Sequence, residues 1–143
     1  VDWIKLKETA KKGIHFLDNV IDAGVYPAQE ISEMAKKTRR IGLGVLGFAD
    51  MLYQLGLPYS SQEARDLAKE IMRVIDEEGW KMSEELAKER GAFPGWEGSD
   101  FNQEVRNCAI TAIAPTGTLS MVAESSGGCE PHYALAYVKN SHS

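Results

Sequence analysis

The sequence has few cysteines and histidines and no long apolar run. Its 143 residues include two cysteines and three histidines. Two cysteines are too few for a disulfide scaffold, and Cys108 and Cys129 stand too far apart in the sequence for a metal-binding motif. No pair of histidines has ligand spacing such as His-x-x-x-His, so no metal site is predicted. A stretch of about 18 apolar residues is also missing, which excludes a membrane-spanning helix.

Charge and composition are those of an ordinary globular domain. Hydrophobic residues make up 43% and charged residues 26% of the sequence, both typical values. The first residues lack the charged-then-apolar layout of a signal peptide, so we expect a soluble protein of the cytoplasm. The net charge of −5 argues against non-specific nucleic-acid binding. A phosphate site in so acidic a chain would have to be local and built from backbone N–H groups.

Residues 1–91 are predicted to be mainly helical. Residues 2–23 carry apolar side chains at helical spacing, with Asp2 placed to cap the helix and Gly24 to end it. Residues 30–37 predict a short second helix with a basic end.

The clearest single element spans residues 61–90. One apolar stripe continues through it over about eight turns, and Gly91 supplies the stop. Ser60 and Glu63 match a capping box at its start. Gly79 interrupts the stripe, which predicts either a bend or a tight crossing with a neighbour.

The segment 42–47 has the form Gly-x-Gly-x-x-Gly, which is the dinucleotide fingerprint. The polar, helix-like residues before it are no strand, and Glu63 and Asp66, the acidic residues about 20 positions on, lie on a new helix. We therefore interpret these glycines as allowing a helix over residues 45–55 to pack closely, and dinucleotide binding as the weaker alternative.

The last third, residues 105–140, is predicted to contain strands. A turn-rich loop over residues 92–104 leads into Cys108–Ala114, a short apolar run that suits a buried strand. Residues 133–138 alternate as a final strand. Cys108 would then lie inside a strand, where it acts as a small apolar filler; a redox role for it and Cys129 is the alternative.

A turn with hydroxyl groups follows the predicted strand and precedes a short helix. Free N–H groups at a helix start favour an anion, and a glycine lets a ligand approach the main chain. The alternative is that the hydroxyls merely cap the helix. The candidate phosphate-binding residues are Pro115, Thr116, Gly117, Thr118, Leu119 and Ser120.

Two segments together resemble the large subunit of ribonucleotide reductase, in the C-terminal part of its barrel. The first is Arg106–Ser120 (RNCAITAIAPTGTLS) with Ser126–Pro131 (SGGCEP). The second is Arg39–Asp50 (RRIGLGVLGFAD), which is similar to the family's Arg-x-Ile-Gly-x-Gly-x-x-Gly-x-Ala-Asp segment. The PTGT form looks most like the adenosylcobalamin-dependent, class II enzymes, with a diiron class I enzyme as the alternative.

The resemblance implies an α/β, helix-dominated fragment of a ten-stranded α/β barrel. It implies that a thiyl radical and a thiol pair replace the ribose 2′-hydroxyl of a ribonucleoside diphosphate or triphosphate with hydrogen. The turn at 115–120 would hold the phosphates, adenosylcobalamin would generate the radical, and the partners would be the remainder of the reductase chain and a possible second copy.

The radical and redox cysteines of the family lie before the matched region, and nothing in residues 1–37 resembles them. We therefore expect a piece of an enzyme with no catalytic residue of its own. The rival hypothesis is a non-catalytic helical interaction module in which 115–120 is only a helix cap.

Overall fold

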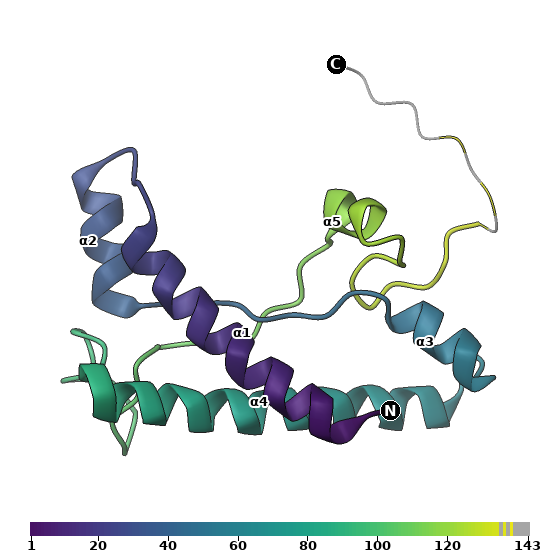
Figure 1. Cartoon of the computed structure of the whole chain (residues 1–143), viewed down its shortest axis with the longest axis horizontal. Coiled ribbons are helices and arrows are strands. Elements are labelled where there is room, and N and C mark those ends of the chain that lie inside the picture. Colours follow the sequence, from purple (N-terminus) through teal and green to yellow (C-terminus); the bar gives the residue numbers. More distant parts are fainter. Residues whose placement is uncertain (135, 137, 139–143) are drawn as a thin grey trace. The chain divides into compact units, whose positions relative to one another are not determined.

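The computed structural model describes residues 1–134, 136 and 138 (Figure 1). The helices are α1 (Trp3–Ala23), α2 (Gln29–Thr38), α3 (Phe48–Leu55), α4 (Gln62–Arg90) and α5 (Gly117–Val122). The chain divides into two compact units. One consists of Val1–Gly44 and Leu67–Ile113, and the other of Val45–Asp66 and Ala114–Ser143. Among the described residues, no helix is both long and apolar enough to cross a membrane.

Helices α1 and α4 confirm the two long helices predicted from the spacing of apolar residues. Asp2 caps α1, because its side chain accepts a hydrogen bond of 3.0 Å from the Lys5 N–H. The predicted capping box of α4 is wrong by one residue: the Ser61 hydroxyl, and not that of Ser60, accepts from the Ala64 N–H at 3.1 Å. A serine at either position matches the cap preference, so the sequence pattern did not distinguish them.

Gly79 marks a tight crossing of α1 over α4, which Figure 1 shows in the first unit. A Cβ atom on Gly79 would lie 2.8 Å from Ile110 Cδ1 and 3.4 Å from Ile14 Cγ1. The absent side chain therefore lets apolar groups from α1 and from the segment after residue 105 meet on α4. The buried members of this core are Ile14, Ile21, Ile41, Leu86 and Ile110.

The predicted strand Cys108–Ala114 is extended but does not form a regular strand. It pairs in parallel with residues 41–43 through hydrogen bonds of 2.8 to 3.1 Å, and the pairing amounts to one isolated bridge, Leu43 with Thr111. Parallel ladders are stable when several strands share a sheet that is covered on both faces. Two short segments do not meet that condition, and the ten-stranded barrel is not seen among the described residues.

The glycines of the Gly-x-Gly-x-x-Gly segment serve this pairing and not the packing of a helix. A Cβ on Gly42 would lie 2.7 Å from the Ala112 Cβ, and one on Gly44 would overlap the Ala112 carbonyl oxygen. The predicted helix over 45–55 begins only at Phe48, after Gly47, whose φ is 79°. Our interpretation of these glycines was therefore wrong, because an extended segment precedes the helix.

The predicted final strand over 133–138 lies partly outside the described residues. Its described members, 133, 134, 136 and 138, form no strand. The loop over 92–104 is confirmed as irregular structure. It contains Phe93, which is 4% exposed and whose N–H donates to the Val105 carbonyl at 3.1 Å.

A buried ionic network joins the two recognised motifs within the first unit. Asp18 on α1 has no exposed surface, and its Oδ1 accepts from Arg39 Nε at 2.8 Å and from Asn107 Nδ2 at 3.0 Å. Arg39 is 3% exposed and also binds both carboxylate oxygens of Asp22 at 2.9 Å. Arg39 belongs to the upstream motif and Asn107 to the downstream one, so Asp18 links the two motifs.

The same network extends to α4. Ser83 is fully buried; its hydroxyl donates to Asn107 Oδ1 at 3.0 Å and accepts the N–H groups of Arg106 and Asn107, both at 3.1 Å. Arg106 Nε lies 3.4 Å from Asp18 Oδ2. Every side-chain oxygen of Asp18 thus has a cationic or amide donor, as a buried charge requires.

Candidate functional site

The predicted phosphate turn lies in the second unit, where it starts α5. Thr116 precedes the helix in the left-handed region (φ 54°), and its carbonyl accepts from the Ser120 N–H at 2.8 Å. The N–H groups of Gly117, Thr118 and Leu119 donate to no described residue, as expected at a helix start. The N–H of Ser120, the last candidate phosphate-binding residue, is instead used within the helix.

The Thr116 hydroxyl is not a helix cap. It accepts a hydrogen bond of 2.8 Å from the Gly128 N–H, and no side-chain hydrogen bond caps α5. The Thr116 side chain therefore ties the start of α5 to the loop after it. This contact does not support the rival hypothesis that the hydroxyl groups of residues 115–120 serve only to cap the helix.

The end of α5 sets the direction of the following loop. The Ser125 N–H donates to the Ser120 carbonyl at 2.9 Å and the Glu124 N–H to the Met121 carbonyl at 3.4 Å. This is the hydrogen-bond pattern of a Schellman motif, with Glu124 in the left-handed position (φ 50°) where glycine is usual. The loop therefore turns back toward the start of α5.

Asp50, on the first turn of α3, holds the other side of this loop. Its Oδ2 accepts from the Ser126 N–H at 2.6 Å, and its Oδ1 lies 2.8 Å from Nε2 of His132. In return, the Asp50 N–H donates to the Ser126 hydroxyl at 3.4 Å, and the Gly47 N–H donates to the Ser126 carbonyl at 2.8 Å. Ser126 is thus held by its N–H, its carbonyl and its side chain.

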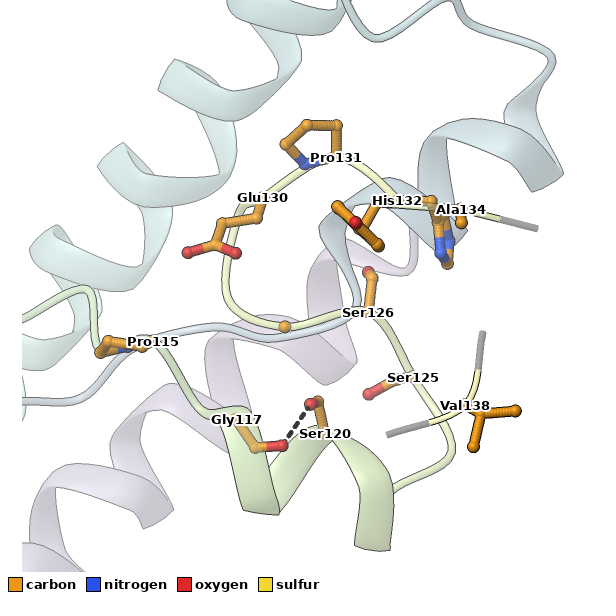
Figure 2. A pocket seen from close by; sticks show the side chains of 12 residues that line it. Pro115, Gly117, Ser120, Ser125, Ser126, Glu130, Pro131, His132, Ala134 and Val138 are labelled. Carbon is orange, nitrogen blue, oxygen red and sulfur yellow. Dashed lines mark hydrogen bonds between the residues drawn. The ribbon is translucent and has the colours of Figure 1, made fainter. Parts of the chain in front are cut away.

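A pocket of about 430 Å³ lies between α5 and this loop (Figure 2). Its volume falls in the range of small-molecule sites. Glu130 contributes a carboxylate, and in Figure 2 this carboxylate lies apart from the serines at the α5 side of the pocket. The polar and small residues that line it include Pro115, Gly117, Ser120, Ser125, Ser126, Gly127, Glu130 and His132.

The contacts of Asp50 make the loop sensitive to acid. The Ser126 N–H, and after it His132, hold the pKa of Asp50 below its ordinary value. Because the folded pKa is lower than the unfolded one, the stabilisation is present above about pH 4 and is lost as the pH falls through the folded pKa. We expect the melting temperature of wild type to fall more steeply between pH 4 and pH 2 than that of Asp50→Asn. Equal slopes would contradict this.

The structure brings together half of the predicted site residues. Pro115, Gly117 and Ser120 line the pocket, whereas Thr116 acts on the loop, and Thr118 and Leu119 are exposed. Sequence reasoning missed Asp50 and Ser125, although Asp50 ends the upstream motif and Ser125 directly precedes the last recognised segment.

The two cysteines and His15 take no part in this pocket. Cys108 is half-buried and Cys129 exposed, and both are free thiols. His15 contacts Arg90 in the first unit, with Nε2 3.0 Å from the guanidinium. Among the residues that the structure describes, no three histidine, cysteine or acidic side chains gather as a metal site.

Comparison with known families places the whole chain in one of them. The model of the ribonucleotide reductase barrel domain matches residues 1–105 and 101–143. The chain therefore belongs to the ribonucleotide reductase family, and specifically to its barrel domain.

Individual relatives agree with the family match. The chain is 46% identical to a vitamin B12-dependent ribonucleoside-diphosphate reductase of Thermoplasma acidophilum, over 98% of this chain and 19% of the relative. A protein of the same name from Mycobacterium tuberculosis is 46% identical over 97% of this chain and 20% of its own length. A ribonucleoside-diphosphate reductase subunit alpha of Chlamydia pneumoniae is 32% identical over 99% of this chain and 17% of its own. The chain spans about a fifth of the length of these relatives.

Proposed function

We propose that this chain is the part of an adenosylcobalamin-dependent ribonucleoside-diphosphate reductase that binds the phosphates of the substrate. The observation that carries the proposal is the pocket beside α5, where Gly117 and Ser120 of the PTGTLS motif face the loop held by Asp50. The N–H groups of residues 117–119, at the start of α5, donate to no described residue and can donate to phosphate oxygens.

The class and substrate are proposed from the relatives. The two relatives at 46% identity are named vitamin B12-dependent, whereas the subunit alpha is 32% identical, which favours class II over class I. All three names specify a ribonucleoside diphosphate, so we propose a diphosphate substrate. The product would be a deoxyribonucleotide for DNA synthesis, made in the cytoplasm, and the complete enzyme could act as a homodimer.

The role of this segment is placement of the substrate. In the complete enzyme the bound cobalamin would supply the radical that starts the reaction. A pocket of about 430 Å³ is too small for a corrin macrocycle, so we assign no residue of this chain to the cofactor. Phosphates held at residues 117–119 would fix the nucleotide so that its ribose meets the radical in a productive orientation.

The chain alone should show no reductase activity. With adenosylcobalamin, a dithiol and a ribonucleoside diphosphate, we expect turnover from the assembled reductase and none from these 143 residues, because nothing in them resembles the radical and redox cysteines. Deoxyribonucleotide formation is measured by chromatography. Turnover by the isolated chain above that of a protein-free blank would contradict the proposal that another part of the enzyme supplies the radical and redox cysteines.

A further inference from the structure

The Ser125 hydroxyl is a buried polar group with no partner among the described residues. Its Oγ is shielded from solvent, and no donor or acceptor in that part of the chain reaches it. Buried hydroxyl groups are almost always hydrogen-bonded, since leaving one unpaired costs free energy. Ser125 also lines the pocket beside α5. An unpaired hydroxyl at the wall of a pocket points to a partner that enters the pocket.

Looseness of the loop does not explain the missing partner. The Ser125 N–H is bonded to the Ser120 carbonyl at 2.9 Å, and the next residue, Ser126, is held by Asp50 and Gly47. The backbone on both sides of the hydroxyl is therefore fixed. A hydroxyl hydrogen rotates freely about its C–O bond, yet no acceptor of the described residues lies within reach of any rotation.

The position of the hydroxyl favours the phosphate end of a ligand. Figure 2 shows the Ser125 hydroxyl on the α5 side of the pocket, near Ser120 and Gly117, with the Glu130 carboxylate lying apart from it. The hydroxyl is a neutral donor beside the N–H groups of residues 117–119, which have no described partner, and such a set of donors suits an anion. The net charge of −5 means that the chain offers no general attraction for an anion.

We propose that Ser125 is a substrate-binding residue whose hydroxyl donates a hydrogen bond to a phosphate oxygen of the ribonucleotide. This inference rests on the proposed function and adds to it a residue outside the PTGTLS motif. Asp50 is then a positioning residue, because it holds Ser126 and with it the loop that carries Ser125.

The test uses Ser125→Ala in the assembled reductase. We expect the dissociation constant for a ribonucleoside diphosphate, measured by calorimetry, to rise about ten-fold, which corresponds to ~1.4 kcal/mol. The inhibition constant of inorganic pyrophosphate should rise by a similar factor. The melting temperature of the unliganded enzyme should stay the same or rise slightly, because the hydroxyl has no partner to lose among the residues that the structure describes.

Two further variants complete this test, one as a control outside the pocket and one as a second substitution of Ser125. Ser60→Ala removes an exposed serine hydroxyl outside the pocket and should change neither binding constant. Ser125→Cys keeps the size of the side chain but donates weakly, so it should weaken binding in the same direction and serves if the alanine variant does not fold.

Each outcome decides between the two proposals. A wild-type enzyme that binds no ribonucleotide overturns the proposed function and this inference with it. A wild type that binds, beside a Ser125→Ala variant that binds equally well, overturns this inference alone. Weakened nucleotide binding with unchanged pyrophosphate inhibition overturns the proposed contact between Ser125 and a phosphate oxygen. A lowered melting temperature with unchanged binding shows that Ser125 stabilises the fold and does not bind the substrate.

Discussion

Replacing Asp18 with asparagine should lower the free energy of unfolding by about 3 kcal/mol, the cost of removing one partner of a buried ion pair. Asp18 is 0% exposed and Arg39 is 3% exposed, and Arg39 Nε lies 2.8 Å from Asp18 Oδ1. The substitution keeps the size of the side chain but removes its charge. It also sets an amide donor against the guanidinium of Arg106, which lies 3.4 Å from Asp18 Oδ2. Urea unfolding of wild type and variant measures the difference.

Asp22→Asn is the matched control, since it removes a carboxylate from the same arginine. The Asp22 side chain is 53% exposed, so water can take over its role, and we expect a much smaller loss of stability. Equal losses for the two variants would show that the interior position of Asp18 is unimportant. The Arg39 guanidinium holds the pKa of Asp22 below its ordinary value, so this smaller contribution should disappear below about pH 4.

Local patterns predicted the helices because a helix depends on residues three and four positions apart. The spacing of apolar residues over 2–23 and 61–90 gave α1 and α4 within a residue or two at each end. The same kind of information did not separate Ser60 from Ser61 as the cap, because both precede the helix and both carry the preferred side chain.

Contacts between distant residues were not predictable in this way. Asp18 contacts residues 21 and 89 positions away, and Asp50 contacts Ser126 across 76 positions. Nothing in the local sequence around Asp18 distinguishes it from a solvated carboxylate, and the only local signal at Asp50 is its place at the end of the upstream motif. The extended segments failed for a related reason: whether a short apolar run forms a regular strand depends on the strands beside it.

One part of the candidate site was predictable from local residue types, and the other part depends on contacts between distant residues. The turn at 115–120 was found from its residue types, and its glycine and serine do line a pocket. The second wall of that pocket comes from the loop after α5, whose course depends on the left-handed Glu124 and on the contacts of Asp50. Glutamate is an unusual residue for that backbone conformation, so the turn of the chain there left no clear signal in the sequence.

Gly117→Val in the assembled reductase should raise the KM for the ribonucleotide about 100-fold or more. A Cβ atom at Gly117 would meet no described atom within 4 Å, and the φ of Gly117 is not in the left-handed region, so the described part of the fold has room for a side chain. Gly117 is also one of the residues that line the pocket. A branched side chain there would keep a phosphate from the N–H groups of residues 117–119, and losing two charge-assisted contacts costs about 3–6 kcal/mol.

Three measurements separate this effect from damage to the fold. The melting temperature of Gly117→Val should stay near that of wild type, because no described atom lies within 4 Å of a Cβ at Gly117. Binding of cobalamin should be nearly unchanged, because we assign no residue of this chain to the cofactor. Thr118→Ala, one residue on, removes a single exposed hydroxyl and should weaken substrate binding by at most about 1 kcal/mol. A Gly117→Val enzyme with a normal KM would show that the turn at 115–120 only starts a helix and does not bind the phosphates. The phosphates would then have to bind elsewhere in the complete enzyme.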